Sequence, residues 1–191
     1  MEYATALNIK NMVCHRCVLI VEQELTKIGL LEAKVELGVI YFKYDLSKET
    51  LCLLTEKLKE LGFDLLVQKH EILIERVKQL IIQLVREDKK LITNLSYLIA
   101  EELQVDYSHV SKLFSERESL TIEKYYIHQR IEKVKEYISY GEYTLAEIAT
   151  KMYYNDLSHL SKQFKSVMGI SPSQYKKEKI YNRNYIDKII T

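Results

Sequence analysis

Two segments in the later part of the chain place apolar residues at helical spacing on either side of a short turn. Residues 144–152 and residues 156–168 each predict an amphipathic helix, because apolar side chains recur every three or four positions. Thr144 followed by Glu147 is the pattern of a capping box, and Gly169 is the residue type favoured just after a helix ends. The pattern therefore predicts a helix-turn-helix over this stretch.

A second copy of the pattern lies about fifty residues earlier. Residues 108–114, SHVSKLF, align with residues 158–164, SHLSKQF. A shared Ser-His-x-Ser-Lys-x-Phe is rarely produced by chance, so the chain contains an internal repeat at the scale of a supersecondary unit. Between the copies, the apolar spacing of residues 121–138 predicts a long helix that joins them.

These motifs resemble those of the AraC/XylS family of bacterial transcription regulators. The similar features are Leu-x-x-Ile-Ala from Leu145, Leu-x-x-x-Phe-Lys from Leu160, Gly-Ile-Ser-Pro-Ser-x-Tyr from Gly169, and Arg130-Ile131 in the joining helix. The resemblance covers residues 71–179. It implies an all-α DNA-binding domain over residues 70–180, with two helix-turn-helix units joined by a long helix, and then a tail over residues 181–191.

The resemblance also implies a function. It predicts a sequence-specific transcription regulator that binds double-stranded DNA, with RNA polymerase and a second copy of the chain, as a homodimer, as further partners to test. No enzyme is expected, because the five histidines are scattered, no paired carboxylates stand out and no Gly-rich phosphate loop is present.

In a helix-turn-helix, the outward N-terminal side chains of the second helix reach base edges in the major groove. The resemblance assigns base-reading positions to Ser108, Ser111 and Lys112 in the first unit and to Leu157, Ser158, His159 and Lys162 in the second. Of these, Lys112 and Lys162 can contact guanine or phosphate. It assigns phosphate contacts to Tyr107, Arg117, Gln163 and Lys165. A solvated helix face is the alternative interpretation of each residue alone, and the repeat favours the set as an interface.

The turns depart from the family pattern. Gln104 and Tyr153 stand where the family usually carries glycine. If their backbones are left-handed, each costs on the order of 1 kcal/mol, which a packed domain tolerates.

The first 69 residues show a different periodicity. Strands are predicted at residues 3–10, at 35–44 as a hairpin around Gly38, and at 63–67. Helices are predicted after Cys17 and after the capping residue Ser47, the second with Leu51, Leu54, Leu58 and Leu61 on one face. The order βαββαβ predicts a ferredoxin-like domain over residues 1–69, so the fold class of the whole chain is α+β.

Met12-Val13-Cys14-His15-Arg16-Cys17 resembles the Met-x-Cys-x-x-Cys of heavy-metal-associated domains, found in copper chaperones and metal-transporting ATPases. Two thiols three positions apart at a helix N-terminus face the same point, and the helix dipole favours their thiolates. Cys14 and Cys17 would suit Cu(I), or Zn(II) if further ligands join. Asn11 and Val13 depart from the family's usual glycine and threonine.

Two alternatives to metal sensing stay open at this point. The domain could serve as a dimerisation or effector module that has lost its metal. The chain could also be a metallochaperone that delivers Cu(I) through Cys14 and Cys17 to a protein partner, although this leaves the repeat unexplained. The remaining cysteine, Cys52, is predicted to be a buried or half-buried thiol.

The net charge of +1 does not by itself indicate nucleic-acid binding, but the distribution of charge along the chain favours it. Residues 121–191 carry twelve basic and eight acidic side chains, whereas residues 70–120 carry seven and nine.

No run approaches the roughly 18 apolar residues of a membrane span, and the N-terminus lacks a basic signal-peptide opening, so a cytoplasmic protein is expected. Residues 72–85 predict the opening helix of the DNA-binding domain, with a coiled-coil dimer seam as the alternative.

Overall fold

The computed structural model describes residues 3–87, 90–178, 184 and 186, and it forms two compact units, residues 1–79 and 80–191. The predicted tail over residues 181–191 lies outside the described residues except for Asn184 and Ile186. Within the part of the chain that the structure describes, no helix is long and apolar enough to cross a membrane.

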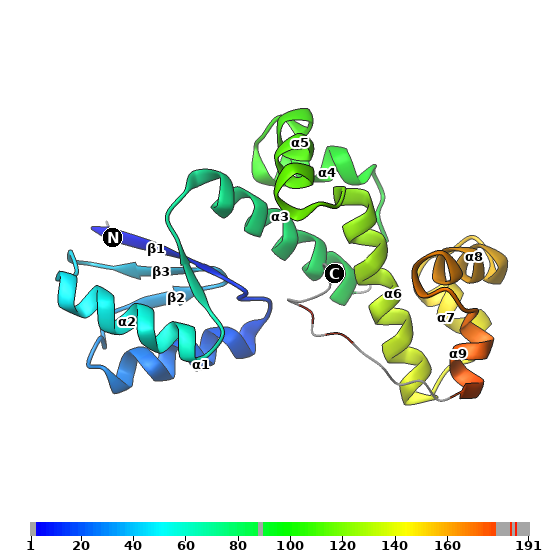
Figure 1. Ribbon diagram of the computed structural model, residues 1–191, viewed down its shortest axis with the longest axis horizontal. Helices are drawn as coiled ribbons and strands as arrows, with labels where there is room; N and C mark the ends of the chain where they lie inside the picture. The colour runs from blue at the N-terminus through cyan, green and yellow to red at the C-terminus, as the bar shows by residue number, and fades with distance from the viewer. Residues whose placement is uncertain (1–2, 88–89, 179–183, 185, 187–191) are drawn as a thin grey trace. The chain divides into compact units, whose positions relative to one another are not determined.

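The N-terminal unit contains a small antiparallel sheet and two helices (Figure 1). In chain order its elements are β1 (Thr5–Lys10), α1 (His15–Lys27), β2 (Lys34–Glu36), β3 (Val39–Phe42), α2 (Lys48–Glu60) and β4 (Asp64–Leu66). The strand order in the sheet is β2-β3-β1-β4, and all three pairings are antiparallel. The predicted hairpin is formed by β2 and β3, with Gly38 between them at φ 85°.

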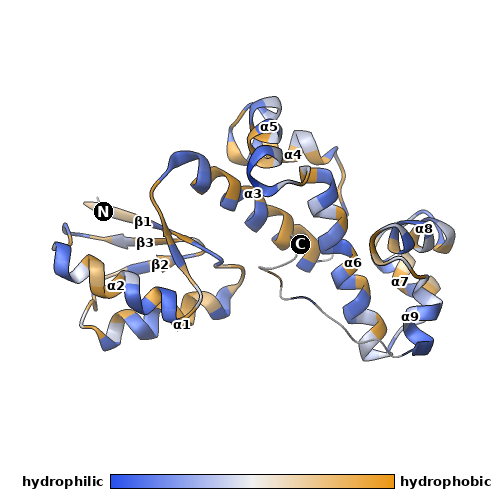
Figure 2. Ribbon diagram, viewed as in Figure 1, coloured by the Kyte–Doolittle hydropathy of each residue, from blue (hydrophilic) through white to orange (hydrophobic). Residues whose placement is uncertain are grey.

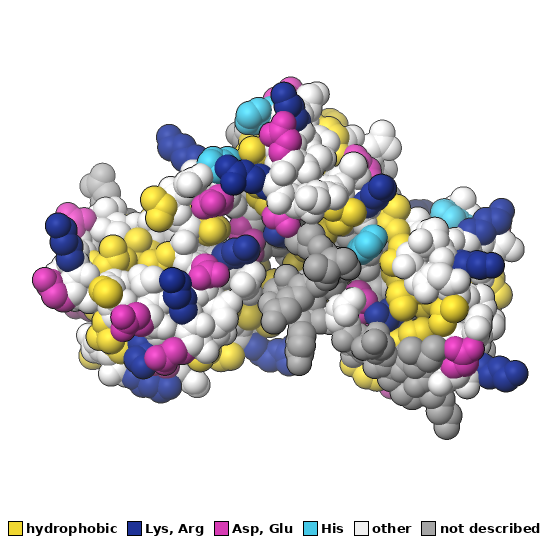
Figure 3. Space-filling model, in the orientation of Figure 1, with side chains coloured by type: hydrophobic (Ala, Val, Ile, Leu, Met, Phe, Trp, Pro, Cys, Tyr) yellow, Lys and Arg dark blue, Asp and Glu magenta, His cyan; other side chains and the backbone are white. Residues whose placement is uncertain are grey.

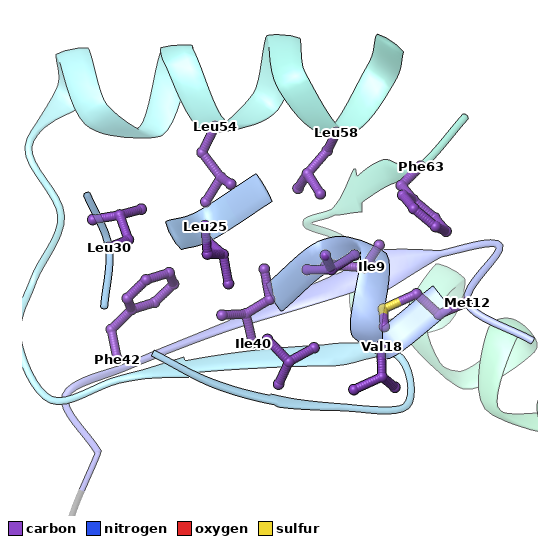
Figure 4. Close-up of a cluster of buried hydrophobic side chains, with 12 residues drawn as sticks. Ile9, Met12, Val18, Leu25, Leu30, Ile40, Phe42, Leu54, Leu58 and Phe63 are labelled. Atoms are coloured by element: carbon purple, nitrogen blue, oxygen red, sulfur yellow. The ribbon is translucent and has the colours of Figure 1, made fainter. Parts of the chain in front are cut away.

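Helices α1 and α2 cover one face of this sheet (Figure 4). Ile9, Ile40 and Phe42 point from the strands toward the helices and are fully buried together with Leu54 and Leu58 of α2. Alternate residues of a strand point to the same face, so Ile40 and Phe42 of β3 both reach this core. A stripe of leucines along α2 closes it from the other side.

Two expectations for α2 need correction. Leu51 and Leu61, predicted to share the apolar face, are 36% and 40% exposed, because they lie at the two ends of the stripe, beyond the part that contacts the sheet. Cys52, predicted to be buried or half-buried, is exposed. A helix turns about 100° per residue, so the position of Cys52 points well away from the side of Leu54 and Leu58.

Helix α3 (Lys69–Arg86) is one continuous helix of 18 residues, with hydrophobic and hydrophilic residues alternating along it (Figure 2). The predicted domain boundary coincides with its first residue, whereas the division between the compact units falls inside it, between Gln79 and Leu80. Its last turns belong to the C-terminal unit, because Val85 is part of that unit's core. The interpretation of α3 as the opening helix of the DNA-binding domain stays a prediction, because the helix up to Gln79 belongs to the N-terminal unit.

The rest of the C-terminal unit is helical. It consists of α4 (Leu95–Leu103), α5 (Tyr107–Glu118), α6 (Ile122–Tyr140), α7 (Leu145–Lys151), α8 (Leu157–Met168) and α9 (Pro172–Glu178). Two helix pairs, α4 with α5 and α7 with α8, pack on the long helix α6, as the repeat predicts. Phe114 of α5 packs on Tyr125 of α6, while Phe164 of α8 packs on Tyr175 of α9.

Candidate nucleic-acid interface

The second helix of each pair begins in the same way. The carboxylate of Asp106 accepts a hydrogen bond from the backbone N–H of His109 at 2.8 Å, and that of Asp156 accepts one from His159 at 2.7 Å. Each aspartate thus satisfies one of the N–H groups that a helix start leaves without a partner. The capping box of Thr144 and Glu147 at the start of α7 is also present.

The turn between the two helices of each pair contains a residue with a left-handed backbone. Gln104 and Tyr153 both have φ 56°. After each of them the next residue donates back into the preceding helix: Val105 N–H to the Ala100 carbonyl at 3.1 Å, and Tyr154 N–H to the Ala149 carbonyl at 2.9 Å. These are the bonds of a Schellman ending, which satisfies helix carbonyls at the price of one left-handed residue. The second turn is one residue longer than the first, because Asn155 has no counterpart before Asp106.

The residues predicted to read bases or contact phosphate lie on the outward side of α5 and α8. Their core counterparts Val110, Phe114, Leu160 and Phe164 are fully buried. The exposed members are Ser108, Lys112, Leu157, Ser158, His159, Lys162 and Lys165, and the half-buried members are Tyr107, Ser111 and Gln163. Figure 3 shows Lys or Arg and His side chains at the surface over both helices, with acidic side chains beside those of α5. The two helices therefore present two similar polar faces.

Two of the residues assigned to phosphate are already engaged within the protein. The Tyr107 hydroxyl donates to the carboxylate of Glu123 at the start of α6. Burial and this hydrogen bond raise the pKa of Tyr107 to about 12, so its proton stays on the oxygen. The Gln163 side-chain oxygen accepts from the Tyr154 hydroxyl at 2.6 Å. Phosphate contacts by Tyr107 and Gln163 stay predictions, and Tyr107 would have to leave Glu123 to donate to a phosphate.

Sequence reasoning missed two residues. His109 is exposed at the position that corresponds to His159. The fifty-residue spacing was sufficient to find it. Arg130 of α6 was noted only as part of a motif, yet its guanidinium donates to the Met152 carbonyl at 2.5 Å and lies 4.0 Å from the centre of the Tyr154 ring. No local sequence pattern predicts the contact between Arg130 and Met152, which are 22 residues apart.

The cysteine pair lies at the start of α1 in the N-terminal unit. Cys14 is the residue before the helix, Cys17 lies in its first turn, and their Sγ atoms are 3.7 Å apart. Both side chains are half-buried, and burial is the main cause that raises the pKa of the Cys17 thiol. Within residues 3–87, 90–178, 184 and 186, no group of three or more His, Cys, Asp and Glu side chains is placed to hold a metal ion.

Asn11, which departs from the family's glycine, adopts φ 71°, a left-handed conformation that glycine and asparagine tolerate best. Its side chain donates to the Gly62 carbonyl at 2.9 Å. Asn11 therefore suits the left-handed position that it occupies in the loop that leads to Cys14.

The C-terminal unit is thus a double helix-turn-helix, a class of domain that presents two helices for the grooves of DNA. A family model described as a helix-turn-helix domain matches residues 99–178. Over 80 residues the chain is 30% identical to the Msm operon regulatory protein of Streptococcus mutans serotype c, which covers 42% of this chain and 29% of that protein. The chain therefore spans less than a third of the length of this relative.

Among solved structures, the C-terminal domain of AraT, a response regulator from Geobacillus stearothermophilus, has the same fold. The match has a TM-score of 0.50 at 22% identity and covers 62% of this chain and 92% of that one. These findings identify residues 99–178 as a helix-turn-helix domain, and the solved structure shows that its fold is shared.

Proposed function

We propose that the chain is a sequence-specific transcription regulator whose helices α5 and α8 enter successive major grooves on one face of DNA. The observation that carries this proposal is the pair of equivalently capped helices with exposed Ser, His and Lys side chains, mounted on one helix. The 19 residues of α6 span about 28 Å. This length is compatible with two reading helices about 34 Å apart, the distance of one DNA turn.

The test compares DNA binding by two double variants. Lys112→Ala/Lys162→Ala removes one exposed lysine from each reading helix. Lys48→Ala/Lys59→Ala removes two exposed lysines from α2 and is the matched control. The DNA used is a set of genomic fragments selected for binding to the parent protein. We expect the first variant to bind them more weakly than the parent does. The slope of log K against log salt should fall in magnitude by about 2, because each phosphate contact contributes about 0.9 to that slope. Equal binding by the first variant and the parent would refute our assignment of the reading face.

We infer that the N-terminal unit has the ferredoxin-like arrangement, which the βαββαβ order and the antiparallel sheet support. We infer also that Cys14 and Cys17 sense a soft metal ion. Two ligands about 2.3 Å from a tetrahedral zinc lie about 3.8 Å apart, so the 3.7 Å between the sulfurs matches two of the four ligands of a zinc ion. Zn(II) would need further ligands, whereas a site with two thiolates suits Cu(I).

Hydrogen bonds to α3 support a sensing function. The backbone N–H of Asn11 donates to the Glu75 carboxylate at 2.8 Å, and the Gln79 side chain donates to the Met12 carbonyl at 3.2 Å. Asn11 and Met12 lead directly into Cys14, and α3 continues into the C-terminal unit. A metal ion that changed the conformation of the loop of residues 11–14 would therefore alter its hydrogen bonds to α3. It could alter DNA affinity only by binding the DNA-bound and free proteins unequally.

A titration of the reduced protein with Cu(I) against a competing chelator tests the metal, with DNA affinity measured in parallel. Binding of one ion that is lost in Cys14→Ser/Cys17→Ser and that changes DNA affinity is the expected result. Binding that leaves DNA affinity unchanged would favour the metallochaperone alternative, and absent or cysteine-independent binding would leave a dimerisation or effector module. RNA polymerase and a second copy of the chain stay predicted partners, to be tested with the DNA-bound protein.

A further inference from the structure

Tyr154, in the turn between α7 and α8, contacts groups on three helices although it belongs to none. Its side chain is 5% exposed. Its hydroxyl donates to the Gln163 side chain at 2.6 Å, and its ring meets the His159 ring edge-to-face, with centroids 5.2 Å apart. The Arg130 guanidinium lies over the ring at 4.0 Å. A buried side chain therefore joins α6 to two residues of the reading helix.

The position of Tyr154 is itself fixed from behind. Its N–H donates to the Ala149 carbonyl, and Arg130 donates to the Met152 carbonyl, so the first part of the turn is held against α7 and α6. The planar guanidinium of Arg130 suits stacking on an aromatic ring. The side chain of Tyr154 is thus held in place, and His159 and Gln163 of α8 pack against it.

The first helix-turn-helix lacks this arrangement. Its corresponding residue is Val105, which has neither ring nor hydroxyl. There the reading helix is tied to α6 through Tyr107 and Glu123 instead, on a residue of the helix itself. The repeat thus preserves the caps of the two reading helices but changes the way in which each is anchored.

We propose that Tyr154 is a positioning residue that sets the base preference of the second unit. The proposal rests on the function proposed above. Its ring limits the orientations open to His159, a predicted base-reading residue, and its hydroxyl orients Gln163, a predicted phosphate contact. Side chains ordered before binding lose less conformational entropy on DNA, so the correct base pair is favoured more strongly over the others.

Two substitutions separate the two contacts. Tyr154→Phe removes only the hydroxyl, and we expect it to weaken binding about 2- to 10-fold on all sequences alike, as the loss of one oriented hydrogen bond does. Tyr154→Val copies the first unit, and we expect it also to relax base discrimination about 2- to 10-fold at the base pairs whose preference His159→Ala removes. Tyr140→Phe, which removes an exposed hydroxyl from α6, is the matched control.

The assay measures binding to single-base variants of a selected site, together with thermal unfolding of each variant. Base pairs read by the first unit, identified with Ser108→Ala and Ser111→Ala, should be unaffected by Tyr154→Val. In the His159→Ala background, Tyr154→Val should have no further effect on base preference. Relaxation spread evenly over both half-sites, or unchanged preference in a folded Tyr154→Val protein, would overturn the proposal.

A second measurement covers the case in which Tyr154→Val does not fold. Nuclear Overhauser contacts between the rings of Tyr154 and His159 must be present in the DNA-bound parent, and their absence would overturn the proposal. A parent that binds no DNA would instead refute the proposed function, so the two failures are distinguishable.

Discussion

The N-terminal cap of α8 allows a prediction whose size follows from the structure. Asp156 accepts from the His159 N–H at 2.7 Å, and the first turn of α8, residues 157–160, contains no acidic residue. Loss of such a cap costs about 1 kcal/mol, within a range of about 0.5–2. Loss of a negative charge at the positive end of a helix adds about 0.3–1 kcal/mol. We expect Asp156→Ala to lower the free energy of unfolding by about 1.5 kcal/mol.

Asp156→Asn is the control, because asparagine caps a helix as well as aspartate but carries no charge. It should cost only about 0.5 kcal/mol. Asp106→Ala should resemble Asp156→Ala, since the cap of α5 has the same geometry at 2.8 Å. Urea unfolding followed by helical circular dichroism measures all three. If Asp156→Asn were as damaging as Asp156→Ala, the hydrogen bond would not be the source of the stability and the reasoning would fail.

Three further predictions concern the core, a turn and pH. Leu54→Ala, at a fully buried position, should destabilise by about 2–5 kcal/mol in urea unfolding, whereas Leu51→Ala at a partly exposed position should cost under about 1 kcal/mol. Gln104→Gly should stabilise by about 1 kcal/mol in the same assay, because glycine adopts φ 56° without strain; a loss of stability would contradict this. Hydrogen bonds from Thr144 lower the pKa of Glu147 below 4.5, so its stabilising effect is present above pH 4.5 and lost as pH falls through the lowered value. Glu147→Gln should reduce the acid sensitivity of the melting temperature, and an unchanged pH profile would refute this.

Local signals in the sequence found the elements of the C-terminal unit. Asp156 before an apolar series, Thr144 three residues before Glu147, and Gly169 after the last apolar position placed the ends of α7 and α8 within a residue or two, because caps act over one turn. The fifty-residue repeat then located the first unit. The side of α5 and α8 that faces outward followed from the helical period.

Contacts between distant residues could not be found in this way. Arg130 with Met152 and Tyr107 with Glu123 depend on how helices pack on α6, and no periodic pattern connects them. Cys52 was misplaced because a cysteine near leucines suggests burial, whereas the helical angle places it toward solvent. Local periodicity thus predicts elements and faces, and packing decides which side chains are already engaged.

The two reading helices should contribute unequally to recognition, and the reason lies in their anchors. In the second unit a buried aromatic ring supports His159, and the surrounding segment, residues 121–191, has an excess of basic residues. In the first unit Lys112 lies 4.0 Å from Glu116, and residues 70–120 have an excess of acidic residues. Because a neighbouring carboxylate offsets the attraction of a lysine to phosphate, we expect α5 to gain less from the DNA backbone than α8. Glu116→Gln should therefore raise DNA affinity at low salt and lose this effect as salt screens the charges, while the base preference of the second half-site stays constant.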